Sequence, residues 1–167
     1  MDKEKLTGIL KSAILLELKG EAFYRKVAET SEIQEIKKIF GIMAKEEVLH
    51  AKILRDKYTE LSRSNKISDT KLPDNKEDSA ADYVLSETIR SQIEAAGFEA
   101  AAISAAIDME SKAIELYSKS ADDATDAGVK ELFNWLADWE RGHHKLLFDL
   151  DRDLRERIWN DNQFWPF

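Results

Sequence analysis

The chain repeats itself once, at a fixed offset. Three polar residues of the first half recur in the second half: Glu17, Glu47 and His50 are matched by Glu110, Glu140 and His143, and each shift is 93 residues (110 − 17, 140 − 47, 143 − 50). The surrounding segments also align without a gap, residues 14–29 with 107–122 and residues 36–54 with 129–147. A period this long, present only twice, does not fit a solenoid of short repeats. A duplicated pair of helices explains it.

Heptad spacing of apolar residues predicts four long helices. Leu10 and Tyr24 flank Glu17 at intervals of seven in the first predicted helix, for example, and Phe40 and Leu54 flank Glu47 in the second. Residues seven apart lie on nearly the same side of a helix, so one row faces one neighbour. The repeated Glu and His residues all occupy rows that are otherwise apolar. We therefore expect their side chains to point into the core.

The boundaries between these helices predict an all-α four-helix bundle. A single domain over 1–167 would contain one helix pair in 1–64, a linker and short helix in 65–96, and a second pair in 97–160. Thr30 and Ser31 separate the first two helices, and Asp126 is expected to cap the fourth. The connection between the pairs is long, so the bundle would have one crossover, with the short extra helix before the third main helix.

Composition excludes several classes of protein. The chain has no cysteine, which excludes disulfides, thiolate metal ligands and iron–sulfur clusters within it. Its net charge of −8 makes nucleic acid an unlikely partner, because an acidic surface repels phosphates. No apolar run approaches the roughly 20 residues of a membrane span, and the first residues do not resemble a signal peptide. A cytoplasmic protein without membrane contact is the expectation.

The repeated residues have the chemistry of metal ligands. A Glu and a His three positions apart lie one turn from each other on the same face of a helix, as in 47–50 and 140–143. Carboxylate and imidazole donors together suit iron, manganese or zinc better than calcium or magnesium. Four ionised carboxylates carry −4 and two divalent ions carry +4, so a filled site would be neutral. The predicted metal ligands are Glu17, Glu47, His50, Glu110, Glu140 and His143.

Several other residues lie near the predicted ligands, and the sequence leaves more than one role open for some of them. Tyr24 and Tyr117 follow Glu17 and Glu110 by seven residues and could donate hydrogen bonds to ligand carboxylates, or simply fill the core. Glu21 is one turn from Glu17 and is either an extra metal ligand or a surface residue. His144 could also reach inward, but the repeat favours His143. Trp135 and Trp139 are expected to serve in core or subunit packing.

With these motifs the chain resembles the ferritin-like superfamily, and within it the rubrerythrin-type erythrin domain, over roughly residues 4–155. The resemblance implies that Glu47 and Glu140 bridge two metal ions. Glu17 with His50 would complete the ligands of one ion. Glu110 with His143 would complete those of the other.

The sequence departs from that family in two respects. Rubrerythrins usually carry a rubredoxin-like iron domain with cysteines, which this chain lacks, so an external electron-donor protein is implied. They also tend to have a seventh carboxylate one turn after the third-helix Glu, where this chain has Ala113. The residues match a simpler six-ligand site, as in bacterioferritin-like centres.

The resemblance implies a non-haem di-iron oxidoreductase that reduces hydrogen peroxide or oxygen with electrons from the external donor, and we expect a homodimer. No catalytic side chain is needed beyond the ligands of the two iron ions. A ferroxidase or iron-binding protein of the ferritin type is one alternative, and it would require a closed shell of subunits. Manganese or zinc in place of iron, a manganese catalase-like reaction, and an interaction module with an unused site are also open.

Overall fold

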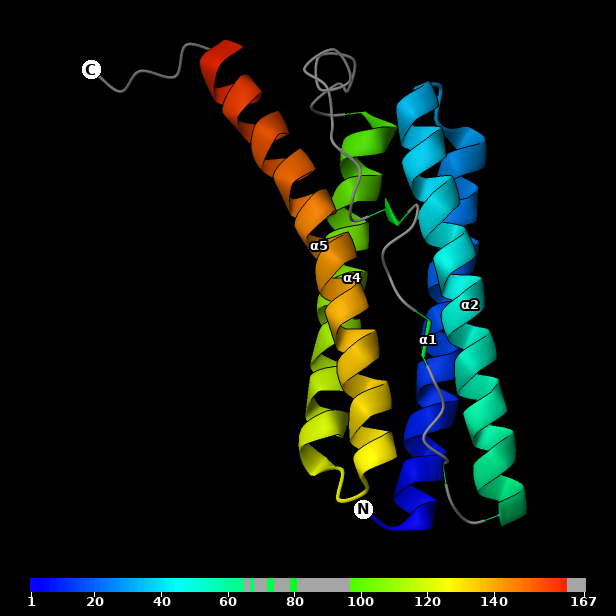
Figure 1. Cartoon of the computed structure of the whole chain (residues 1–167). Coiled ribbons are helices and arrows are strands. Elements are labelled where there is room, and N and C mark those ends of the chain that lie inside the picture. The colour runs from blue at the N-terminus through cyan, green and yellow to red at the C-terminus, as the bar shows by residue number, and fades with distance from the viewer. Residues whose placement is uncertain (65–66, 68–71, 74–78, 81–96, 162–167) are drawn as a thin grey trace.

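The computed structural model describes residues 1–64, 67, 72–73, 79–80 and 97–161, and this part of the chain forms a bundle of four helices. The helices are α1 (Lys3–Thr30), α2 (Gln34–Ser64), α4 (Phe98–Asp123) and α5 (Ala127–Asp161). Figure 1 shows them as two hairpins, α1 with α2 and α4 with α5. The predicted all-α four-helix bundle is thereby confirmed. The short extra helix predicted within 65–96, before the third main helix, lies almost wholly outside the described residues.

Polar side chains cap the N-termini of two of the helices. The Asp2 side chain accepts a 2.8 Å hydrogen bond from the N–H of Lys5 and so caps α1. The Asp126 side chain accepts a 3.1 Å bond from the N–H of Val129 and caps α5 as predicted. Each cap satisfies a backbone donor that has no partner within its own helix, and such a cap contributes about 1 kcal/mol.

Helices α1 and α4, one from each hairpin, run antiparallel to each other. The amino group of Met1 donates a 2.9 Å hydrogen bond to Thr125, which follows the end of α4. Lys5 forms a 2.9 Å ion pair with Asp123, the last residue of α4. The start of α1 therefore lies beside the end of α4, as Figure 1 also shows. Because both contacts are exposed, they contribute little to stability, but they show that α1 and α4 run in opposite directions.

The hydrophobic core consists of two clusters that follow the internal repeat. One contains Tyr24 and Phe40, and the other contains their repeat counterparts Tyr117 and Phe133. All four rings are at most 1% exposed, and burying a large apolar side chain contributes about 1.5–3 kcal/mol. Along every helix the predicted metal ligands lie between the residues of one cluster and those of the other. The core thus encloses a polar layer at its centre.

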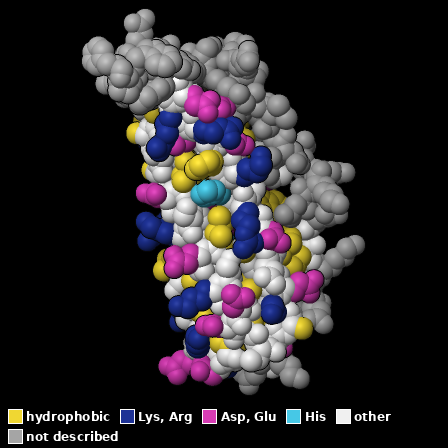
Figure 2. Space-filling model, turned by 90° about the vertical axis from the view of Figure 1, so that its left-hand side faces the viewer, with side chains coloured by type: hydrophobic (Ala, Val, Ile, Leu, Met, Phe, Trp, Pro, Cys, Tyr) yellow, Lys and Arg dark blue, Asp and Glu magenta, His cyan; other side chains and the backbone are white. Residues whose placement is uncertain are grey.

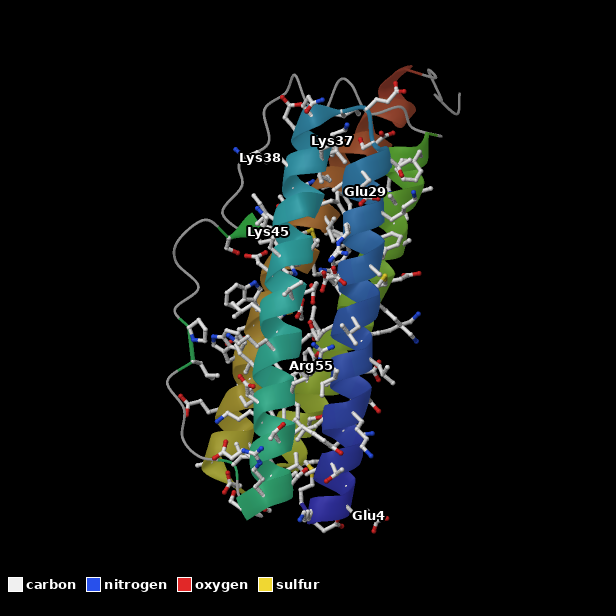
Figure 3. The ribbon with its side chains drawn as sticks, turned by 90° about the vertical axis from the view of Figure 1, so that its right-hand side faces the viewer. Glu4, Glu29, Lys37, Lys38, Lys45 and Arg55 are labelled. Carbon is white, nitrogen blue, oxygen red and sulfur yellow. The ribbon has the colours of Figure 1, made fainter. Side chains whose placement is uncertain are left out.

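Unlike the residues of that buried polar layer, charged residues on the outside of the bundle are exposed to solvent. Figure 3 shows Glu29, Lys45 and Arg55 on the outer side of the α1–α2 pair, where all three are exposed. The face in Figure 2 carries basic and acidic side chains interspersed with each other. None of the described helices combines the length and the hydropathy that crossing a membrane requires.

Candidate metal centre

Six polar side chains meet in the middle of the bundle, and every helix contributes. They are Glu17 from α1, Glu47 and His50 from α2, Glu110 from α4, and Glu140 and His143 from α5. None is more than 3% exposed. Their inward orientation follows from the sequence, because each occupies an apolar row of its helix. These are the six residues predicted as ligands.

Their donor atoms form two overlapping groups of four. In each group the donor atoms all lie within 4.8 Å of one another: Glu17, Glu47, His50 and Glu140 in the first, and Glu47, Glu110, Glu140 and His143 in the second. Glu47 and Glu140 belong to both groups. Carboxylates that belong to both ligand sets are placed so that they could bridge a pair of metal ions.

Both histidines present the same ring nitrogen to the carboxylates. Nδ1 of His50 lies 3.1 Å from Oε2 of Glu17 and 3.1 Å from Oε1 of Glu140. Nδ1 of His143 lies 3.1 Å from Oε2 of Glu140 and 3.3 Å from Oε1 of Glu110. Glu140 therefore contacts both rings, which stack with their centroids 6.3 Å apart. Nδ1 is the nitrogen positioned to ligate, and the proton of each neutral ring would reside on Nε2.

Burial and mutual contact shift the pKa values of these groups strongly. Burial, followed by the charges of Glu140 and Glu17, raises the pKa of Glu47 well above its usual range. Burial and then Glu140 raise the pKa of Glu110 to about 8. Burial alone would also raise the pKa of Glu140, but contacts with His50 and His143 outweigh it and lower that pKa. Without metal, burial and mutual contact therefore favour the protonated forms of Glu47 and Glu110.

The histidines complete this proton-filled arrangement. Burial alone would lower the pKa of each ring, but the surrounding carboxylates, Glu140 around His50 and Glu110 around His143, raise both pKa values well above the usual range. Protons thus provide the positive charge that four buried carboxylates need, since uncompensated buried charges cost several kcal/mol each. Divalent cations would supply the same charge on the same donor atoms. The residues fit two metal ions of the iron, manganese or zinc type.

Two tyrosines hold ligand carboxylates across the repeat. The hydroxyl of Tyr24 donates a 2.6 Å hydrogen bond to Oε1 of Glu110, and the hydroxyl of Tyr117 donates to Oε1 of Glu17. Burial and the charge of Glu110 raise the pKa of Tyr24, so this residue stays protonated and able to donate. Such bonds fix the orientation of a ligand carboxylate.

Two residues considered from sequence lie apart from the donor groups. Glu21 forms an ion pair with Arg25 on the same helix and belongs to neither group of four. The ring of His144 stacks on the exposed Phe148 with centroids 6.0 Å apart, and His144 is likewise outside both groups.

A small cavity of about 10 Å³ adjoins the carboxylates, which is room for about one water-sized molecule. Besides the four ligand glutamates it is lined by Leu16, Gly20, Tyr24, Met109 and Ala113. A Cβ atom added at Gly20 would lie 3.4 Å from Cγ and Cδ of Glu47. Gly20 and Ala113 occupy matching positions in the repeat, so small residues border the cavity from both halves.

Three residues contact the histidines in a way that the sequence did not predict. Glu46 is 8% exposed, and its Oε2 lies 2.8 Å from Nε2 of His143. The indole rings of Trp139 and Trp135 lie edge-on to His50, with centroids 5.0 Å and 5.6 Å away. Glu46 directly precedes a ligand in the sequence, but the repeat does not point to it, because the matching residue, Trp139, is not acidic.

Comparison with known proteins agrees with this geometry. A family model described as rubrerythrin matches residues 8–150, which contain all six residues of the centre. The chain belongs to the rubrerythrin family. A hypothetical protein from Pyrococcus furiosus has a similar solved structure, with a TM-score of 0.66, 25% sequence identity, and coverage of 93% of this chain and 97% of the other. A search of curated proteins finds no match to this sequence.

Proposed function

We propose that this rubrerythrin-family protein is a non-haem di-iron oxidoreductase that reduces hydrogen peroxide with electrons from a separate donor protein. The observation that supports the proposal is the pair of four-residue donor groups that share Glu47 and Glu140. These residues would hold two iron(II) ions side by side, and the pair would supply the two electrons that one peroxide molecule needs. With two protons, each peroxide then yields two water molecules.

The side chains of this protein would bind, orient and shield the reacting centre. Bound iron(II) ions would supply the electrons and the Lewis acidity that weakens an O–O bond. Tyr24 and Tyr117 hold the terminal carboxylates, Glu110 and Glu17, in place. The cavity beside Gly20 admits a molecule of about the size of water, and the enclosing core excludes bulk solvent. This arrangement favours a small oxidant over an organic substrate.

The electrons would come from outside the chain. The sequence contains no cysteine, so a rubredoxin-like iron site cannot be formed by its residues. A soluble one-electron carrier protein is the class of donor we propose.

An anaerobic titration of metal-free protein with iron(II), followed by rapid mixing with peroxide or oxygen in parallel, tests the proposal. We expect two irons per chain and a faster reaction with peroxide than with oxygen. A faster reaction with oxygen would replace peroxide reduction by an oxidase or ferroxidase function. A manganese-loaded protein that converts peroxide to oxygen and water without a donor would favour the catalase-like alternative.

Two neighbouring histidines provide a matched pair of variants. His143→Ala should abolish stoichiometric binding of the second iron and the reaction with peroxide. His144→Ala removes a ring that lies outside both donor groups and should leave both unchanged. Full turnover by the His143→Ala variant would refute the assignment of the centre.

A further inference from the structure

The internal repeat is broken at one pair of positions that contacts the metal centre. Glu46 and Trp139 are related by the same offset as the ligands, since 139 − 46 is 93. Each contacts the histidine of the other half: Glu46 on α2 meets His143 on α5, and Trp139 on α5 meets His50 on α2. The six ligands are identical in the two halves. The residue that contacts each histidine from the other half is not: it is an acidic Glu46 at His143 and an aromatic Trp139 at His50.

Glu46 is built into its position behind His143. Its side chain is 10% exposed, and Oε2 lies 2.8 Å from Nε2 of the ring. The backbone N–H of Ala80, in the connection between the hairpins, lies 3.3 Å from Oε1 and 3.4 Å from Oε2 of the same carboxylate. Ala80 is itself fully buried. The carboxylate is therefore oriented from one side by the crossover connection and contacts the histidine on the other.

The corresponding place behind His50 is aromatic. The ring of Trp139 lies 5.0 Å from that of His50 at an interplanar angle of 80°, and Trp135 lies 4.9 Å from Trp139. Within the described part of the chain, Nε2 of His50 has no hydrogen-bond partner. An indole offers no carboxylate oxygen to the ring N–H, so among the described residues this histidine has no counterpart of Glu46.

We propose that Glu46 is a positioning residue that makes the two halves of the centre unequal, so that the first metal ion binds on the His143 side. When Nδ1 of a histidine ligates, a carboxylate that accepts from Nε2–H fixes the tautomer and increases the electron donation of the ring. Loss of such a partner typically weakens metal binding about ten- to a hundred-fold. Glu46 also adds a negative charge on that side of the centre, which attracts a cation. The inference rests on metal binding at the proposed centre but not on peroxide reduction.

Calorimetric titration of the metal-free protein with zinc(II) tests this order without any turnover. We expect two steps whose affinities differ about ten- to a hundred-fold. Glu46→Gln keeps the shape of the side chain but removes its charge, and should weaken the tighter step by that factor while leaving the weaker step in place. Trp139→Phe, which keeps an aromatic wall behind His50, should preserve two unequal steps.

The ring N–H protons of the zinc-loaded protein, observed by NMR after ¹⁵N-histidine labelling, give an independent readout. The His143 Nε2–H should exchange slowly and resonate downfield of that of His50, and Glu46→Gln should move the His143 signal alone. Two equal zinc steps in the unmodified protein, or equal weakening of both by Glu46→Gln, would overturn the inequality. Failure to bind two zinc ions would overturn the proposed metal centre itself, so the two outcomes are distinguishable.

Discussion

The hydroxyl of Tyr24 on α1 lies 2.6 Å from Oε1 of Glu110 on α4, so a residue of the first hairpin holds a ligand of the second. The reciprocal bond, from Tyr117 on α4 to Glu17 on α1, holds a ligand of the first hairpin from the second. Each terminal carboxylate is therefore held by a tyrosine of the other half of the repeat. The crossed bonds make the centre depend on both hairpins being docked.

Removing either hydroxyl should weaken metal binding without unfolding the protein. Tyr24→Phe and Tyr117→Phe each keep the buried ring but leave a ligand carboxylate without its donor. We expect a ten- to hundred-fold lower affinity for zinc(II), about the loss typical of removing a partner of a ligand. Competition with a chromophoric chelator measures it.

Tyr58→Phe is the control for these variants. Tyr58 is half-buried on α2, lies under the ammonium of Lys11 and belongs to neither donor group. Its affinity for zinc should equal that of the unmodified protein. An equal loss in all three variants would mean that the hydroxyls act through general stability and not through the carboxylates.

Gly20 should control access to the cavity beside the carboxylates. Gly20→Ala places a methyl group 3.4 Å from Glu47, an ordinary contact, so we expect the fold and the two metal sites to persist. The methyl fills a space that a small oxidant would need. Moving a reacting group by about 1 Å can lower a rate about a hundred-fold. We therefore expect the variant to react with peroxide about ten-fold more slowly than the unmodified protein, or slower still. Rapid mixing of the iron(II)-loaded variant with peroxide checks this.

Gly8→Ala is the matched change on the same helix. A Cβ at Gly8 would meet nothing within 4 Å, and the residue is exposed. Alanine there should raise the free energy of unfolding by about 0.5–1 kcal/mol and leave the peroxide rate unchanged. If Gly20→Ala also left the rate unchanged, the cavity would not be the route to the centre.

The sequence predicted much of this architecture because the repeat and the heptad rows carry the same information. Glu17 and Glu47 lie in apolar rows of long helices, and such rows must face a neighbouring helix. Helix ends were predictable where a capping residue is present, as at Asp126. Conversely, spacing alone could not tell that Tyr24 would meet Glu110, because that pairing depends on which helices become neighbours across the bundle.

The contacts of Glu46 and Trp139 with the histidines could not be predicted from the sequence, for a different reason. Glu46 is buried because the chain returns from α2 and places the N–H of Ala80 against its carboxylate. A residue on the border between the inner and outer faces of a helix has no distinctive period. Trp139 was correctly predicted as a packing residue, but its contact with His50 requires the relative rotation of α2 and α5.

Metal-free protein should become less stable as the pH rises from about 6 to about 8. The pKa of Glu110 is raised from 4.5 to about 8 in the folded state, and the pKa values of both histidines are raised as well. The folded state then holds protons that the unfolded chain has lost, so the free energy of unfolding falls with increasing pH. Urea unfolding at several pH values measures this slope.

Zinc-loaded protein should show the opposite trend. Metal ions replace these protons, so metal affinity, and with it the stability that metal confers, should increase over the same pH range. Stability that rises with pH in the metal-free protein would contradict the proton-filled centre.

The two shared carboxylates should respond differently to neutralisation, although the repeat relates them. In the metal-free protein, burial and the neighbouring carboxylates raise the pKa of Glu47 and so favour its neutral form, whereas contacts with both histidines lower the pKa of Glu140. Glu47→Gln should therefore change the unfolding free energy by less than about 1 kcal/mol, because a neutral group replaces a neutral group. Glu140→Gln leaves two buried imidazolium rings without their common partner and should destabilise by about 3–5 kcal/mol. Both variants should lose tight binding of the second zinc ion. Urea unfolding at pH 6 with a parallel zinc titration separates the two effects, and equal destabilisation by both substitutions would show that the charge is not concentrated on Glu140.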